Sequence, residues 1–192
     1  MTDSLINDAI SYIKTLFAGN ADGHDADHSL RVYKNAMRIA AGYPEADIEL
    51  IALASLLHDA DDHKLFQTEN NHNARIFLKE KNVPEETVEE TVKIIEEVSF
   101  SKNRGKTPKT LEGKIVQDAD RLDAMGAIGI ARTFAYGGRN GRSIDDSVQH
   151  FHDKLLQLEG MLNTGEARAL AKERHEFLEQ FLEELNKETR LG

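Results

Sequence analysis

The chain has 192 residues, of which 40% are hydrophobic and 30% are charged, so its composition is that of a folded protein with a core. It contains no cysteine, which excludes disulfides, cysteine-based zinc sites and thiol nucleophiles together. The formal net charge of -10 argues against binding to a nucleic-acid polymer, because such binding depends on Lys and Arg neutralising phosphates. A small anionic ligand remains compatible with this charge, since a metal ion or a few local cations can reverse the sign inside a cleft.

The N-terminal segment 1–17 is amphipathic and carries acidic residues. It has no basic start followed by an apolar run, so we do not expect it to be a signal peptide. No apolar stretch approaches 18 residues, so we expect no membrane-spanning segment and no membrane partner. A cytoplasmic location is therefore the default expectation.

Apolar residues recur every three or four positions along most of the chain, which predicts helices, and no strand alternation is convincing. Pro44 and Pro84 fit the first turns of two of these helices. Gly-rich or polar segments at 19–23, 101–110 and 136–143 predict loops. In chain order, the predicted helices cover about 5–17, 27–41, 44–57, 70–81, a segment from 84, 111–134 as one or two helices, 145–162 and 166–189. The sequence thus predicts a single all-α domain.

The strongest chemical signal is the pair His58-Asp59, directly after the run 51–57, which is apolar except for Ser55. Charged groups rarely follow a buried helix so closely unless they are paired or bind a metal. Asp61 and Asp62 come next, and crowded carboxylates repel each other unless a cation lies among them. A His-Asp dipeptide is also common by chance, so this pair alone does not establish a metal site.

Two further segments, 23–32 and 115–123, also place polar groups among apolar helix residues. Together the three segments can supply two imidazoles and two carboxylates, from His28, His58, Asp59 and Asp118. Such a set suits Mn²⁺, Co²⁺, Ni²⁺, Fe²⁺, Zn²⁺ or Mg²⁺. Four protein ligands leave open positions on an octahedral ion, where water and substrate can bind.

The order His, His-Asp, Asp resembles the HD-domain metal-dependent phosphohydrolase superfamily. The residue patterns of segments 23–32, 57–64 and 117–132 are similar to those of its small bacterial single-domain branch of the YedJ/YpgQ type. This resemblance implies one HD-type helical bundle over residues 1–192. Its metal-site core would cover about 20–135, and helices of about 145–189 would pack on that core.

The resemblance also implies roles for particular residues, with a divalent ion, Mn²⁺ favoured, as cofactor. The metal ligands it implies are His28, His58, Asp59 and Asp118. Asp62 is the candidate catalytic residue: it follows His58 by one helical turn and would orient and deprotonate the attacking water, although it also fits a solvated acid at a helix end. His24, Asp25 and Asp61 are expected to support the ligands, and His24 and Asp25 also fit a helix cap.

Phosphate binding requires cations near the metal, and three residues qualify by position. Arg31 follows His28 by one turn, Lys64 closes the His-Asp cluster, and Arg121 follows Asp118 by one turn. Each of the three could equally neutralise neighbouring acids.

The function that these expectations favour is hydrolysis of small nucleotides by metal-activated water. Within the branch, the most favoured reaction converts a nucleoside triphosphate to a monophosphate and pyrophosphate. The alternatives are a 5′-nucleotidase or other phosphomonoesterase, or a metal- or nucleotide-binding regulatory module without turnover. The sequence leaves the oligomeric state open, and a homodimer is compatible with it.

Overall fold

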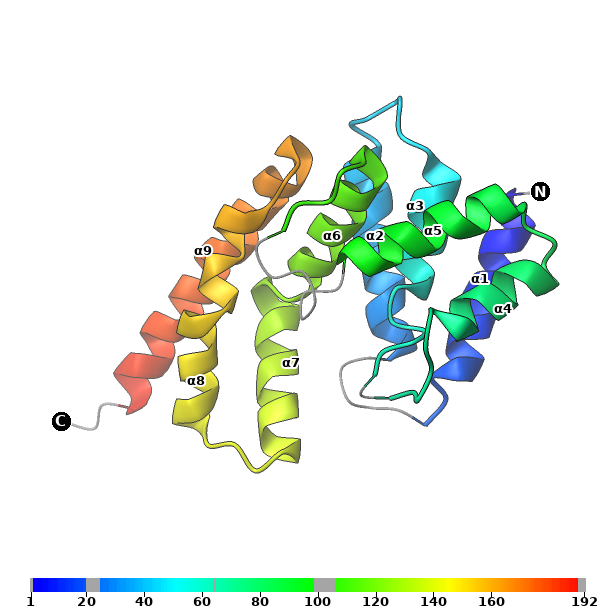
Figure 1. Cartoon of the computed structure of the whole chain (residues 1–192). Coiled ribbons are helices and arrows are strands. Elements are labelled where there is room, and N and C mark those ends of the chain that lie inside the picture. The colour runs from blue at the N-terminus through cyan, green and yellow to red at the C-terminus, as the bar shows by residue number, and fades with distance from the viewer. Residues whose placement is uncertain (1, 20–24, 64, 99–105, 190–192) are drawn as a thin grey trace. The chain divides into compact units, whose positions relative to one another are not determined.

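The computed structural model describes residues 2–19, 25–63, 65–98 and 106–189, and the structural statements below concern these residues. They form helices joined by turns, with no β-strand among them, which confirms the predicted all-α class (Figure 1). No helix in this described part is both long enough and apolar enough to cross a membrane. In chain order the helices are α1 (Thr2–Leu16), α2 (Ala26–Ala40), α3 (Ile48–Leu57), α4 (His72–Glu80), α5 (Glu85–Val98), α6 (Leu111–Asp123), α7 (Gly126–Arg139), α8 (Ile144–Asp153), the short 3₁₀ helices η1 (Leu155–Gln157) and η2 (Glu159–Met161), and α9 (Gly165–Thr189).

The helices group into two compact units, residues 1–120 and residues 121–192. The division falls inside α6, between Asp120 and Arg121. Each unit is therefore described by itself. The prediction of one domain over 1–192 stays a prediction.

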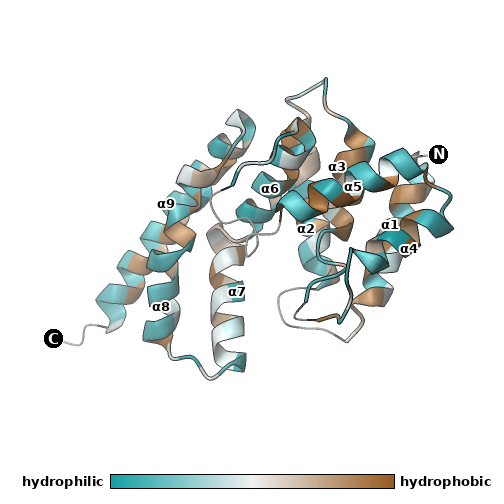
Figure 2. Ribbon diagram, viewed as in Figure 1, coloured by the Kyte–Doolittle hydropathy of each residue, from teal (hydrophilic) through white to brown (hydrophobic). Residues whose placement is uncertain are grey.

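Helix α3 is the centre of the first unit, as its apolar composition predicts. Every residue from Ile51 to Leu57 is buried, and α1, α2 and α5 pack against this helix. Helix α5 shows the mixed hydrophilic and hydrophobic colouring of an amphipathic helix in Figure 2, and its buried face includes Val88, Val92 and Ile95. The polar residues His58 and Asp59 follow directly at the carboxyl end of this buried helix.

Aspartate caps determine where two helices of the first unit begin. The Asp25 carboxylate accepts the backbone N–H of His28 at 2.8 Å and starts α2. The Asp47 carboxylate accepts from the backbone N–H groups of Glu49 and Leu50, at 2.9 and 3.0 Å, and starts α3. The predicted start of α3 at Pro44 was therefore too early. The helix begins directly after Asp47, whose carboxylate accepts backbone N–H groups of its first turn.

The second unit corrects two predictions. The Gly-rich segment 136–143 was predicted as a loop, but α7 continues through Arg139. A Cβ on Gly137 would lie 2.6 Å from Ser147 Oγ, so this glycine allows α8 to approach α7 closely. The predicted helix 145–162 ends at Asp153 and is followed by η1 and η2.

Helices α6 and α7 are separated by a tight turn, so the range 111–134 forms two helices. Gly126 has a φ of 65°, and a Cβ on Gly129 would lie 2.3 Å from the Ala124 carbonyl oxygen. We expect Gly129→Ala to destabilise the chain by about 1–3 kcal/mol, because the backbone of the turn must move. Gly138→Ala in the same helix is the control: no atom lies within 4 Å of its Cβ position, and alanine favours a helix by up to about 1 kcal/mol.

The two free energies of unfolding, measured by denaturant titration, check this expectation. Equal stability of the two variants would contradict the tight turn.

Candidate metal centre

Three helices of the first unit bring two histidines and two aspartates together. His28 lies in the first turn of α2, where the Asp25 cap holds its backbone. His58 and Asp59 follow the last residue of α3 directly, and Asp120 lies near the end of α6. Both imidazoles are almost fully buried, and their Nε2 atoms lie 3.2 Å apart.

Carboxylate oxygens surround this pair of nitrogen atoms. The two oxygens of Asp59 divide between the histidines, with Oδ2 at 3.4 Å from His28 Nε2 and Oδ1 at 3.5 Å from His58 Nε2. Asp120 Oδ1 lies 3.5 Å from His28 Nε2 and 3.9 Å from His58 Nε2. His28, His58 and Asp120 therefore direct three ligand atoms at one point, and Asp59 lies against both imidazoles.

The tautomer of His58 follows from its other ring nitrogen. His58 Nδ1 lies 2.9 Å from the Ser55 carbonyl oxygen, which can only accept a hydrogen bond. Nδ1 therefore carries a proton, which leaves Nε2 as the nitrogen available to a metal ion. This is the arrangement that metal-binding histidines usually adopt, with the second nitrogen bonded to a carbonyl or carboxylate.

The donor set fits a divalent cation. Nitrogen and oxygen ligands at ~2.1 Å from one ion lie about 3 Å apart when they are adjacent, which is close to the separations observed here. Among the described residues, His28, His58 and Asp120 offer ligand atoms that all lie within 4.8 Å of one another. Asp59 approaches both imidazoles as well.

The carboxylate of α6 that meets the imidazoles belongs to Asp120, whereas the sequence pointed to Asp118. Asp118 lies on the same helix and is fully buried. Two residues along an α-helix differ by about 200° in direction, so these two side chains point to nearly opposite sides of α6. Asp120 is thus a further candidate ligand from this segment, and Asp118 stays the ligand expected from the sequence.

Asp62 does not lie one helical turn after His58, as the sequence predicted. Helix α3 ends at Leu57, and residues 58–61 form a turn in which the Asp62 N–H bonds to the Asp59 carbonyl at 3.0 Å. Asp62 therefore does not share a helix face with His58. Its largely buried carboxylate lies 3.7 Å from Nδ1 of the exposed His63.

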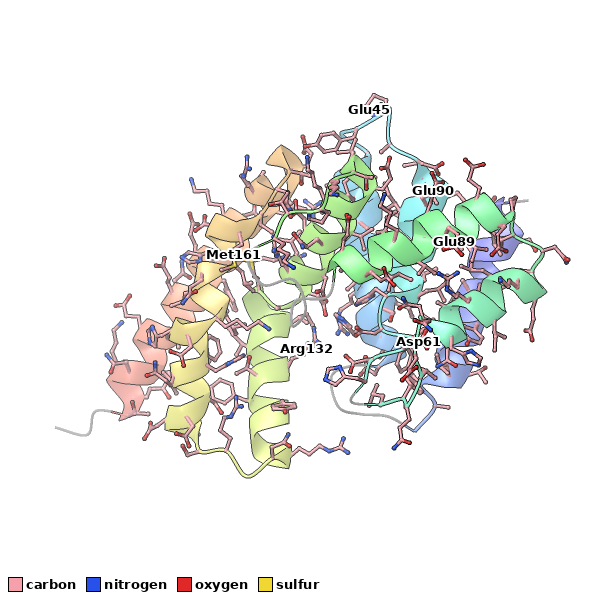
Figure 3. All side chains as sticks on the ribbon, viewed as in Figure 1. Glu45, Asp61, Glu89, Glu90, Arg132 and Met161 are labelled. Atoms are coloured by element: carbon pink, nitrogen blue, oxygen red, sulfur yellow. The ribbon has the colours of Figure 1, made fainter. Side chains whose placement is uncertain are left out.

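The remaining predicted residues have different environments. Asp25 is the N-cap of α2, as one of its two interpretations held. Arg31 is half-buried on α2. Arg121 is buried, and its Nη1 donates to the Met161 carbonyl of η2 inside the second unit (Met161 is labelled in Figure 3). His24 and Lys64 lie outside the described residues.

Comparison with known proteins identifies the fold family. The family model of the HD domain matches residues 25–125, which contain His28, His58, Asp59 and Asp120. The chain belongs to the HD-domain family. It is 38% identical to YpgQ of Bacillus subtilis over 187 residues, which cover 93% of this chain and 90% of YpgQ.

Solved HD-domain structures agree with this assignment. The crystal structure of Bacillus subtilis YpgQ in complex with ADP matches with a TM-score of 0.86 and 34% identity, over 100% of this chain and 98% of that one. An HD-superfamily hydrolase from Bacillus thuringiensis matches with a TM-score of 0.82 and 37% identity, over 100% of both chains. The chain is therefore an HD-domain hydrolase, a metal-dependent phosphohydrolase.

Proposed function

We propose that this HD-domain protein hydrolyses nucleoside triphosphates to monophosphates and pyrophosphate, with Mn²⁺ as the favoured metal. The observation that carries the proposal is the convergence of His28, His58 and Asp120 on one point, with Asp59 against both imidazoles. The ADP complex of YpgQ supports a nucleotide as the substrate class, because that relative resembles this chain over its whole length.

These four side chains are ligands in this proposal. A divalent ion bound by them would polarise a phosphoryl oxygen and lower the pKa of a bound water. The hydrogen bond from His58 Nδ1 to Ser55 keeps the imidazole ring in one orientation. Asp59 approaches both histidines and so holds the two sides of the site together.

Proton transfer and phosphate binding are assigned to residues around the ligands. Asp62, three residues after Asp59, is proposed to orient the attacking water and accept its proton. Arg31 and Lys64 are proposed to bind substrate phosphates. Arg121 is proposed as a third phosphate ligand, and its hydrogen bond to the Met161 carbonyl also fits a structural role.

A panel of nucleotides crossed with a panel of divalent metals tests the reaction, with products identified by mass. With Mn²⁺, we expect nucleoside triphosphates to give a monophosphate and pyrophosphate, because attack at the α-phosphorus leaves the two outer phosphates joined. Orthophosphate released from monophosphates would instead indicate a phosphomonoesterase. Nucleotide binding without turnover under any metal would indicate a regulatory module.

A further inference from the structure

The segment that follows His58-Asp59 is joined to α4 by hydrogen bonds in both directions. Asp61 Oδ1 accepts the backbone N–H of Asn73 at 2.9 Å, and Asp61 Oδ2 accepts that of Ala74 at 3.1 Å. In return, Asn73 Nδ2 donates to the Ala60 carbonyl at 2.8 Å. We call these three bonds the Asp61–Asn73 clamp; Figure 3 labels Asp61 in its position beside α4.

The clamp supplies the N-terminal cap of α4. Asn71 precedes the helix with a φ of 53° and makes no capping hydrogen bond through its side chain. The first N–H groups of a helix lack partners within the helix, and a carboxylate there is also favoured by the helix dipole. Asp61 meets both requirements from a distant position in the sequence. The cap of α4 therefore also restrains the turn that carries the metal ligands.

Helix α4 is itself held by α1 at the same point. The Tyr12 hydroxyl donates to the Asn73 carbonyl at 3.1 Å, and the Tyr12 ring stacks on Phe77 with centroids 4.7 Å apart. Burial raises the pKa of the Tyr12 hydroxyl, and the charges of Asp61 and Glu80 raise it further, so the hydroxyl keeps its proton and donates. Helix α4, which carries Asn73, is thus held against α1.

We propose that Asp61 and Asn73 are positioning residues that set the cation affinity of the His58-Asp59 pair, an inference that rests on the metal site proposed above. The Ala60 carbonyl held by Asn73 belongs to the residue directly after Asp59. Without the clamp, the turn gains alternative conformations and the Asp59 carboxylate loses its fixed position between the imidazoles. Binding of the ion then carries the entropic cost of ordering the turn.

Mn²⁺ affinity, measured by titration followed by electron paramagnetic resonance, tests the clamp without reference to activity. We expect Asp61→Asn and Asn73→Ala each to weaken Mn²⁺ binding by about tenfold, the lower range for residues that support metal ligands. Asn73→Ala is the decisive variant. It keeps the backbone N–H that Asp61 caps and introduces a better helix former, so a loss of affinity cannot come from a weaker α4.

Ile76→Gly is the matched control, since residue 76 is 41% exposed in the middle of α4 and glycine destabilises the helix there. We expect this variant to melt earlier and to bind Mn²⁺ with the affinity of the unaltered chain. Unaltered affinity in Asn73→Ala would overturn the clamp, even if Asp61→Asn does not fold. Failure of the unaltered chain to bind Mn²⁺ would overturn the metal site itself, a result distinct from the failure of the clamp alone.

Discussion

Replacing His58 with alanine is expected to remove both the bound divalent cation and the hydrolytic activity, while the helical fold remains. The side chain supplies one of two buried Nε2 atoms that lie 3.2 Å apart. A metal ion contributes several kcal/mol to stabilising transition-state charge, so its loss should lower kcat/KM by at least about a thousandfold. Asp59→Ala should have the same effect, because its two oxygens reach both imidazoles.

Elemental analysis, turnover and circular dichroism on the same preparations check this expectation. His152→Ala is the matched control, since it removes an exposed imidazole in the last turn of α8. It should retain metal content and activity. Unchanged metal content in both His58→Ala and Asp59→Ala would mean that the cluster is an ordinary polar feature of a helical interaction protein.

The second large effect distinguishes the two aspartates of α6. Asp120→Asn is expected to lower metal affinity and activity by about a hundredfold, because its Oδ1 faces both imidazoles. Asp118→Asn tests the ligand expected from the sequence: metal retained by this variant would leave Asp120 as the carboxylate from α6. Asp118→Asn should in addition lower the free energy of unfolding, because the residue is fully buried.

Metal titration and denaturant unfolding of both variants separate these effects. The reverse result, with metal lost from Asp118→Asn and retained by Asp120→Asn, would support the assignment made from the sequence.

Much of the fold could be predicted because helical periodicity and apolar runs are local properties of the sequence. The run 51–57, apolar except for Ser55, predicted a central helix with His58 and Asp59 at its end, and α3 has this arrangement. The choice between Asp118 and Asp120 could not be made from spacing, because a shift of two residues changes the side of the helix but hardly changes the pattern. The similarity of the segment to the family predicted Asp118, and the structure adds Asp120 to the candidate ligands.

Contacts between distant residues account for the features of the fold and of the site that could not be predicted. The bonds between Asp61 and α4 join positions 12 and 13 residues apart, and no periodicity predicts them. Glycine in 136–143 suggested a loop, but Gly137 serves close packing against Ser147. Asn73 has no recognisable metal-site signal in the sequence. Its hydrogen bonds with Asp61, Ala60 and Tyr12 are evident only in the structure.

The hydrogen bond from His58 to the Ser55 carbonyl orients the imidazole by a contact within the protein alone. The carbonyl belongs to the last turn of α3, so the imidazole is directed by the helix itself and needs no cation to hold it. This ring is therefore oriented before an ion binds, unlike the ligands of small domains that fold only around zinc. An ion that binds the folded chain still stabilises it, and exchange of one divalent ion for another should change that stability according to its affinity.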